Sequence, residues 1–385
     1  MPARDAMPQD IDRIASVNFD FSDEQNMLRD QARRYLGEAS SKENVRKWLD
    51  SKTTATATLW QALAEMGWLG AAIDEDHGGL GLGGLELCVL AEELGRALTP
   101  VPFFSTVCVA AELLQRCPAA PRRDGLLGAI AAGTAIVSLT NGLEQAIATG
   151  HGLPQWSDGV VSGVCERVPD LMEATALLTI AREPDGTLVV LAVAADAAGV
   201  GRQALAGFDD LRPHGRLTLA SAAAEVLLRG TEAASLLEKI RDRAAIYTAF
   251  EQVGTAESAM SLAREYTLQR YAFGRPLAGN QAVKHRLADM LVKNELARSN
   301  AYYGAWALVN DESALPQAAA AARLSATEAL IFAAEEGLHL HGGIGYTWEA
   351  DCHLYLRRAR LLAVSLGGAA AWSRRLLAAH RSIAH

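Results

Sequence analysis

The stretch from Arg270 to Met290 reads RYAFGRPLAGNQAVKHRLADM, and an aromatic residue, a glycine and a proline interrupt its helical pattern. Gly274 and Pro276 indicate a turn between two helices. Gln281 follows Arg270 by eleven positions, and further basic residues flank the break at Arg275, Lys284, His285 and Arg286. An arginine fixed at a helix end, beside free backbone N–H groups, can bind a pyrophosphate. The residues alone leave this interpretation and that of a basic turn capping two helices equally open.

Three regions of different periodicity follow one another along the chain. Apolar residues at helical spacing predict a helical domain over residues 1–120. After Pro118 the apolar segments become short and β-branched, with Asp185 and Gly186 as a hairpin turn, which predicts a β domain over residues 121–230. Helical periodicity then returns and predicts a four-helix bundle over residues 231–385. Its expected helices cover about 231–269, 281–309, 316–340 and 351–380. The sequence thus predicts a mostly α-helical fold with an inserted β domain.

Composition excludes several classes of protein. The 385 residues carry a formal net charge of −9, which argues against nucleic acid or an acidic membrane as the main partner. No apolar run approaches the ~18–20 residues of a membrane span, and the N-terminus lacks the layout of a signal peptide. The five cysteines form no C-x-x-C pair, so we expect reduced thiols in a cytoplasmic protein. His341 and His353 are not at metal-ligand spacing, and we interpret them as structural, with no metal site.

Three blocks resemble the acyl-CoA dehydrogenase family and occur in the family's order. The motif R-x-x-F-G-x-P-x-x-x-x-Q-x-V-x-H-x-L-A-D-M begins at Arg270, the segment HLHGGIGYTWEADCHLYLRRAR begins at His339, and a third block runs from Leu59 to Leu98. The resemblance implies an N-terminal helical domain, a middle β-barrel-like domain and a C-terminal four-helix bundle, with FAD as cofactor and electron-transfer flavoprotein as acceptor. It also implies α,β-dehydrogenation of an acyl-CoA thioester, in which a carboxylate takes the α-proton and the flavin takes the β-hydride.

One set of the family's FAD-binding positions is retained. In the family these residues reach across a subunit interface to the ADP part of the neighbour's FAD. They are Arg270, Phe273, Gln281, Gly342 and Gly343, with His339 in place of a common Gln. Gly368 and Ala370 replace a Thr and a Gln that, in the family, also help to bind the nucleotide, so two of the polar side chains on this side of the site are missing.

The catalytic and flavin positions lack their functional groups. The family places its base at one of two positions, which are Leu366 and Ala244 here, so the catalytic base is unknown. On the flavin side Thr140 matches a family Thr, but the Gly-Ser-Asp that should follow is absent, and Pro169 stands where a Thr would bond the flavin edge. We interpret three other carboxylates as charges on solvated helix faces rather than as bases: Glu92, Glu93 and Glu251.

The resemblance therefore implies one subunit of a heteromeric FAD-dependent acyl-CoA dehydrogenase, of the kind that acts on steroid-derived or other bulky acyl-CoAs. A self-sufficient homotetramer with an unplaced base and a flavin-free scaffold or CoA-ester-binding protein remain alternatives. Small residues at Ala244, Ala245 and Gly254 could widen an acyl pocket. We also expect an obligate oligomer built through the bundle, because large rings in the last helices favour interfaces. These rings are Tyr302, Tyr303, Trp306, Trp348, Tyr355 and Trp372.

Overall fold

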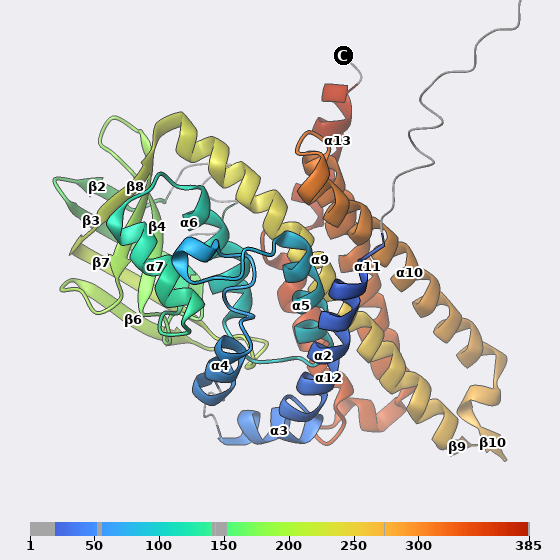
Figure 1. The fold of residues 1–385 in the computed structure, drawn as a ribbon. Helices are drawn as coiled ribbons and strands as arrows, with labels where there is room; N and C mark the ends of the chain where they lie inside the picture. Colours follow the sequence, from blue (N-terminus) through green and yellow to red (C-terminus); the bar gives the residue numbers. More distant parts are fainter. Residues whose placement is uncertain (1–19, 52–55, 141–142, 144–151, 273, 384–385) are drawn as a thin grey trace, which may run out of the picture.

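The computed structural model describes residues 20–51, 56–140, 143, 152–272 and 274–383. Figure 1 shows a β-sheet on one side and a set of long helices on the other, with α9 (Gly230–Gln269) running from the sheet to the far tip of the bundle. This architecture confirms the predicted mostly α-helical fold with an inserted β domain. Within the described residues, no helix is both long and apolar enough to cross a membrane.

The N-terminal helices come before the sheet. Ser22 caps the first of them: its side chain accepts from the Gln25 N–H, and the Gln25 side chain accepts from the Ser22 N–H. The last helix before Pro118 is a π-helix followed by one α-helical turn, a difference in hydrogen bonding that apolar spacing does not reveal. The elements are α2 (Asp23–Ala39), α3 (Lys42–Ser51), α4 (Thr56–Glu65), η1 (Glu75–His77), α5 (Gly84–Arg96), η2 (Phe104–Ala111), α6 (Glu112–Arg116) and α7 (Pro121–Ala131).

The sheet contains eight strands of the described residues, in the order β6-β7-β3-β2-β4-β5-β8, with β1 parallel to β4. The predicted hairpin is confirmed, because β4 and β5 pair antiparallel around Gly186, whose φ is 89°. Both of these strands are buried nearly throughout. The strands are β1 (Val137–Leu139), β2 (Gln155–Ser157), β3 (Val160–Pro169), β4 (Ala176–Arg182), β5 (Leu188–Ala194), β6 (Val200–Leu205), β7 (His214–Ala223) and β8 (Glu225–Arg229).

The C-terminal helices match the prediction except at the end of the chain. The expected helix over 351–380 is two helices, because the backbone turns at Leu366 (φ 55°) and Gly367 (φ 106°). The buried guanidinium of Arg323 donates to the Ser365 carbonyl (2.8 Å) and also to the Leu362 carbonyl, and these bonds fix the turn. The remaining elements are β9 (Tyr271–Ala272), β10 (Arg275–Pro276), η3 (Leu277–Gly279), α10 (Gln281–Asn310), α11 (Leu315–Leu340), η4 (Gly342–Tyr346), α12 (Cys352–Val364) and α13 (Ala369–Ile383).

Glycines let α5 and α9 pack closely. A Cβ added to Gly254 would lie 2.0 Å from the Glu92 carbonyl oxygen, and one added to Gly95 would lie 2.3 Å from the Glu251 carbonyl oxygen. The expectation that Gly254 widens an acyl pocket is therefore wrong, since the neighbouring helix backbone fills that space. Ala244 and Ala245 are also fully buried, in the main hydrophobic core.

The two adjacent carboxylates of α5 lie inside the protein, which corrects their interpretation as a solvated helix face. Glu92 is 0% exposed and Glu93 is 1% exposed. Arg33 of α2 and Arg96 of α5 both bind Glu93, at 2.7 and 3.0 Å, while Arg298 of α10 binds Glu92 at 2.5 Å. Buried carboxylates need such partners. The ion cluster thus ties α2 and α10 to α5, and apolar periodicity could not predict it.

Candidate functional site

The turn that follows α9 is a short hairpin, as the sequence indicates. β9 and β10 pair antiparallel, and Gly274 between them has a φ of 77°. The Arg270 N–H donates to the Tyr266 carbonyl (2.8 Å), and the Arg270 carbonyl accepts from the Leu277 N–H (2.8 Å). Figure 1 shows β9 and β10 at the tip of α9, far from the sheet. The backbone of Arg270 is therefore fixed while its side chain is exposed.

A second glycine turn, at Gly342 and Gly343 of η4, lies against the end of α9; we call this turn and the one at Gly274 the glycine turns. The His341 ring, which is 7% exposed, stacks on the Tyr266 ring with their centroids 4.3 Å apart, so η4 and the last turn of α9 are neighbours. Gly342 has a φ of 64°, and a Cβ on Gly342 or Gly343 would meet no atom within 4 Å. A ligand can approach open backbone of this kind closely. Tertiary structure thus brings both predicted turns to one end of the bundle.

The predicted nucleotide residues in these turns face outward. Arg270, Gln281 and His339 are exposed, as are Gly342 and Gly343 of η4. Among the described residues, no carboxylate pairs with the Arg270 guanidinium. Gln281 is the first residue of α10, where backbone N–H groups lack intrahelical acceptors. Phe273 lies outside the described residues.

Neither base position can accept a proton. Ala244 is 0% exposed within α9, and Leu366 packs partly buried against the main core. Glu251, interpreted from the sequence as a charge on a helix face, is in fact 2% exposed, so that interpretation is wrong. Its Oε1 accepts from Arg212 (2.7 Å) and from Arg358 (3.1 Å). We therefore assign Glu251 to a structural ion network.

That ion network joins the sheet to the helices. Arg358 of α12 is 0% exposed and donates to Asp209 (2.6 Å) as well as to Glu251. Asp209 and Arg212 belong to the loop before β7, so three elements meet at buried charges. Sequence reasoning missed this network, because Asp209 and Arg358 are 149 positions apart and no local pattern links them.

Of the flavin-side positions, Thr140 is buried and Pro169 is half-buried. Thr140 is 1% exposed and its Oγ1 accepts from the Cys165 thiol (3.6 Å), while the Pro169 carbonyl accepts from Ser138 (2.6 Å). The segment expected to carry Gly-Ser-Asp falls mostly on residues 141–142 and 144–151, outside the described residues. Proline at 169 offers neither a hydroxyl nor an N–H group to a ligand. The described residues therefore do not fit a flavin ring at these positions.

Asp170 follows Pro169 and is a buried carboxylate that the sequence did not single out. It is 4% exposed and accepts from the Ser105 hydroxyl (2.5 Å). Burial raises the pKa of Asp170, although the nearby Arg212 charge and the Ser105 hydrogen bond oppose the rise. Ser105 lies on η2 and Asp170 lies after β3, so this contact again joins the helices to the sheet.

The histidines are structural, as expected from their spacing. His341 Nδ1 donates to the Gly337 carbonyl (2.6 Å), and His353 stacks on Trp348 with centroids 4.7 Å apart. Within the described residues, no group of His, Cys, Asp and Glu side chains could hold a metal ion. All five cysteines are buried and unpaired, which agrees with the expected reduced thiols.

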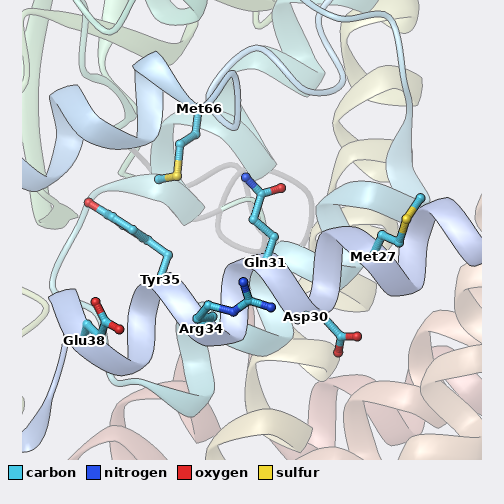
Figure 2. A pocket seen from close by; sticks show the side chains of 7 residues that line it. All are labelled: Met27, Asp30, Gln31, Arg34, Tyr35, Glu38 and Met66. Carbon is cyan, nitrogen blue, oxygen red and sulfur yellow. The ribbon is translucent and has the colours of Figure 1, made fainter.

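An open groove of about 490 Å³ lies between α2 and the end of α4, and Figure 2 shows the side chains that line it. Met27, Gln31 and Met66 point toward the groove, with Arg34 and Glu38 along one edge. None of the predicted nucleotide residues or base positions lines it. The groove is therefore separate from the two glycine turns.

Two models of one protein family match this chain. The family model described as "Acyl-CoA dehydrogenase, N-terminal domain" matches residues 22–134, and that described as "Acyl-CoA dehydrogenase, C-terminal domain" matches residues 237–381. The chain belongs to the acyl-CoA dehydrogenase family. Members of this family are oxidoreductases that act on CH–CH groups, and the fold derived above is the family's fold.

Curated relatives of this acyl-CoA dehydrogenase include proteins of Mycobacterium tuberculosis. Acyl-CoA dehydrogenase IpdE2 is 31% identical over 350 residues, covering 88% of this chain and 91% of the relative. Acyl-CoA dehydrogenase FadE34 is 32% identical and covers 95% of this chain and 48% of the relative.

Solved structures of paired chains are also similar. One is a variant of the Tcur3481–Tcur3483 steroid acyl-CoA dehydrogenase (30% identity, TM-score 0.83), covering 94% of this chain and 98% of that one. Another is the ChsE4–ChsE5 complex of M. tuberculosis (27% identity, TM-score 0.84), covering 96% and 99%.

The family's cofactor, FAD, fits one part of this acyl-CoA dehydrogenase chain better than another. At the glycine turns, the exposed Arg270 guanidinium and the open backbone of Gly342 and Gly343 suit a pyrophosphate. At the flavin positions the Pro169 carbonyl already accepts a hydrogen bond from Ser138, and the two base positions, Leu366 and Ala244, are apolar. Among the described residues, the glycine turns thus suit a phosphate group, whereas the positions expected at the flavin ring offer it no matching polar group.

Proposed function

We propose that this chain is one subunit of a heteromeric FAD-dependent acyl-CoA dehydrogenase, in which it completes the nucleotide end of an FAD site and leaves the base to a partner chain. One observation carries the proposal: the arginine and glycine turns face solvent with open donors, whereas both base positions hold apolar side chains. Because this chain lacks a base at both positions, we infer that its glycine turns bind the nucleotide end of an FAD whose flavin end is held by another subunit.

The proposed contacts follow from the local geometry. Arg270 would bind phosphate, because its backbone is fixed at the end of α9 and its guanidinium is unpaired among the described residues. Gln281 sits at the positive end of α10, which favours an anion. Gly342 and Gly343 offer backbone N–H groups, with His339 beside them. We assign Phe273 to the same site from its motif position. These residues would hold the nucleotide end of FAD, whose flavin would supply the acceptor for the β-hydride of the acyl-CoA substrate.

Exposed apolar side chains support a partner subunit. On α10, Leu291, Val292 and Leu296 are 48%, 58% and 60% exposed, and near η4 Tyr346 is 76% exposed. Apolar side chains gathered on a helix face are typical of an interface. The similar structures whose names join two chains favour a partner that is a related acyl-CoA dehydrogenase. The assembly that we propose is a tetramer of two copies of each chain.

The proposed substrate is an acyl-CoA with a bulky, steroid-derived acyl group, a substrate class taken from the similar steroid acyl-CoA dehydrogenase. The proposed electron acceptor is an electron-transfer flavoprotein, and the proposed compartment is the cytoplasm. In the reaction the partner's carboxylate would take the α-proton, and this chain would hold and orient the cofactor's nucleotide.

Turnover and flavin content test the proposal directly. The chain is purified alone and after co-expression with a related chain that carries a carboxylate at a base position, and each preparation is assayed with FAD and a panel of acyl-CoAs. We expect one FAD per two chains and turnover in the complex only, because loss of a general base costs ~10²–10⁴-fold in rate.

Two controls separate the alternatives. In the first control, the partner's catalytic carboxylate is replaced by the corresponding amide. This complex should keep its FAD and lose turnover. Turnover of ~1–10³ s⁻¹ by the chain alone would show a self-sufficient enzyme instead. A stable complex without flavin absorbance would show a scaffold or a CoA-ester-binding protein.

A further inference from the structure

A crevice of about 220 Å³ lies where α2 ends, and it is separate from the glycine turns and the groove of Figure 2. Its lining comes from α2, α3, α5, α9 and the start of α12, and Figure 1 shows the labels of α2 and α12 next to each other, with α3 below them. At about 30 Å³ per water molecule, this volume holds roughly seven waters or an organic molecule of about that many non-hydrogen atoms. The residues that line the crevice play no part in the function proposed above.

Basic side chains dominate the charge of the crevice. Arg33, Lys42 and Arg96 all line it. Arg33 donates to Glu93 through Nε (3.0 Å) and Nη2 (2.7 Å), which leaves its Nη1 available. The exposed Lys42 ammonium has no hydrogen bond or ion pair with another described residue. The acidic side chains in the lining are already paired: Glu93 binds two arginines, and Asp351 binds Arg46 at 2.5 Å.

The first turn of α3 adds further donors. Ser41 precedes this ten-residue helix and accepts from the Asn44 N–H (3.4 Å), while Lys42 begins the helix and lines the crevice. The first N–H groups of a helix have no intrahelical acceptor, and they favour an anion. Ser40 lines the crevice as well, and its hydroxyl is enclosed without a hydrogen-bond partner among the described residues. A buried hydroxyl of this kind is costly, and rotation about χ1 would offer it to a ligand.

The floor of the crevice is apolar. Leu36, Val45 and Leu354 are 1%, 2% and 3% exposed and all line it. Gly37 lies at its edge on α2, where an added Cβ would meet no atom within 4 Å. Glycine is a poor helix former, so a glycine in mid-helix is unfavourable for the helix itself. Because it has no side chain, it leaves open space here that any other residue would fill. The crevice therefore offers donors at its mouth and apolar surface beneath them.

We propose that this crevice binds a small amphipathic monoanion, a carboxylate with a short aliphatic or aromatic body. The carboxylate would lie at the start of α3, within reach of Lys42 and Arg33, and the apolar body would cover Leu36 and Leu354. The bound molecule would touch α2, α3, α5 and α12 together. It would therefore stabilise the contact between the N-terminal helices and the bundle, because binding to the folded state alone raises its stability.

Binding of sodium hexanoate to the purified complex tests the proposal, with calorimetric titration and the thermal unfolding midpoint as readouts. Hexanoate should bind saturably and raise the midpoint. We expect 1-hexanol, which lacks the charge, and inorganic phosphate, which lacks the apolar body, to bind at least about tenfold more weakly. If hexanol or phosphate bound as tightly as hexanoate, the proposal would be overturned, because binding would then not require both the charged donors and the apolar floor.

Variants locate the binding. Lys42→Gln should weaken hexanoate binding by about tenfold, the equivalent of one charge-assisted contact. Lys47→Gln is the matched control, because Lys47 lies on the same helix but pairs with Glu43 and does not line the crevice. Gly37→Leu should fill the crevice and abolish binding without lowering the unfolding midpoint. Should that variant fail to fold, Lys42→Glu replaces it and should abolish binding through charge reversal. Unchanged binding in a folded Gly37→Leu or Lys42→Glu protein would overturn the proposal.

Discussion

Arg270 differs from the other arginines that the motifs point to. Arg358, 88 positions further along, is 0% exposed and binds Asp209 and Glu251. Arg270 is exposed, its backbone is held by two hydrogen bonds, and no described carboxylate neutralises it. An ion pair would have satisfied the guanidinium within the chain. Because Arg270 makes no ion pair with a described residue, its full positive charge can bind an anion, as a phosphate-binding arginine must.

Replacing Arg270 by alanine should weaken FAD retention in the co-expressed complex. One charge-assisted contact contributes roughly 1.5–3 kcal/mol, so the dissociation constant should rise about tenfold to a hundredfold. Flavin released on dilution, followed by fluorescence, measures the change. Arg264→Ala is the control, since Arg264 is equally exposed on α9 but lies before the hairpin. Equal flavin retention by both variants in an intact complex would remove Arg270 from the site.

Glu257 predicts a dependence of stability on pH. Burial opposes its ionisation, but Arg96 (2.8 Å) and Arg298 (2.5 Å) outweigh burial and hold the pKa of Glu257 down at about 2. Because its folded pKa is lowered from an ordinary value of 4.5, its stabilising contribution is complete above about pH 4.5 and is lost as the pH falls toward 2.

Glu257→Gln should therefore lower the free energy of unfolding at pH 7, and the gap to the natural protein should narrow as the pH falls from about 5 to 3. Urea titrations at several pH values measure this gap. Glu265→Gln is the control, because Glu265 is exposed on the same helix. A gap that stays constant over this pH range would mean that the glutamate contributes through packing rather than through charge.

At the scale of elements, the contact between α5 and α9 depends on glycine. Gly254→Ala would place a Cβ 2.0 Å from a backbone oxygen of α5, so the helices would have to separate. Overpacking of this kind costs about 1–3 kcal/mol. Gly125→Ala is the matched control: it lies within α7 with no atom within 4 Å of the added Cβ, and it should stabilise the protein by ~0.5–1 kcal/mol. Urea midpoints of the two variants should therefore shift in opposite directions, and a neutral Gly254→Ala would contradict the close packing.

At the scale of the whole molecule, the surface of one chain predicts an oligomer. The six rings expected at an interface differ in exposure. Tyr355 and Trp372 are 4% and 2% exposed and belong to the chain's own core, Trp348 is 46% exposed, and the three rings on α10 are half-buried. The apolar face of α10 remains uncovered in a single chain. Obligate interfaces bury ~2,000–5,000 Å² and resemble a core cut in half.

We therefore expect a tetramer by light scattering at micromolar concentration, with the mixed form of two chain types favoured. Leu296→Glu should weaken assembly, since Leu296 is 60% exposed at the centre of that face. Met27→Glu is the control, because Met27 is 64% exposed but lies on α2. A folded, stable monomer of the natural chain would contradict both the assembly and the shared cofactor site.

The sequence by itself determined the order of the elements, most helix boundaries and the hairpin at Gly186, because apolar periodicity and turn residues act locally. It also determined which functional groups the chain can and cannot supply: the residues of the glycine turns are present, and the side chains at Leu366 and Ala244 exclude a base there. The domain boundaries at 120 and 230 stay a prediction.

Only the tertiary structure decided which polar residues are buried and which are free. Glu92, Glu93 and Glu251 look like surface charges in the sequence, yet arginines from distant segments hold them inside. Arg270 and Arg358 look alike in the sequence, yet one faces solvent and the other is enclosed. A local pattern cannot distinguish these cases, because the cost of burying a charge depends on partners that the fold brings from far along the chain.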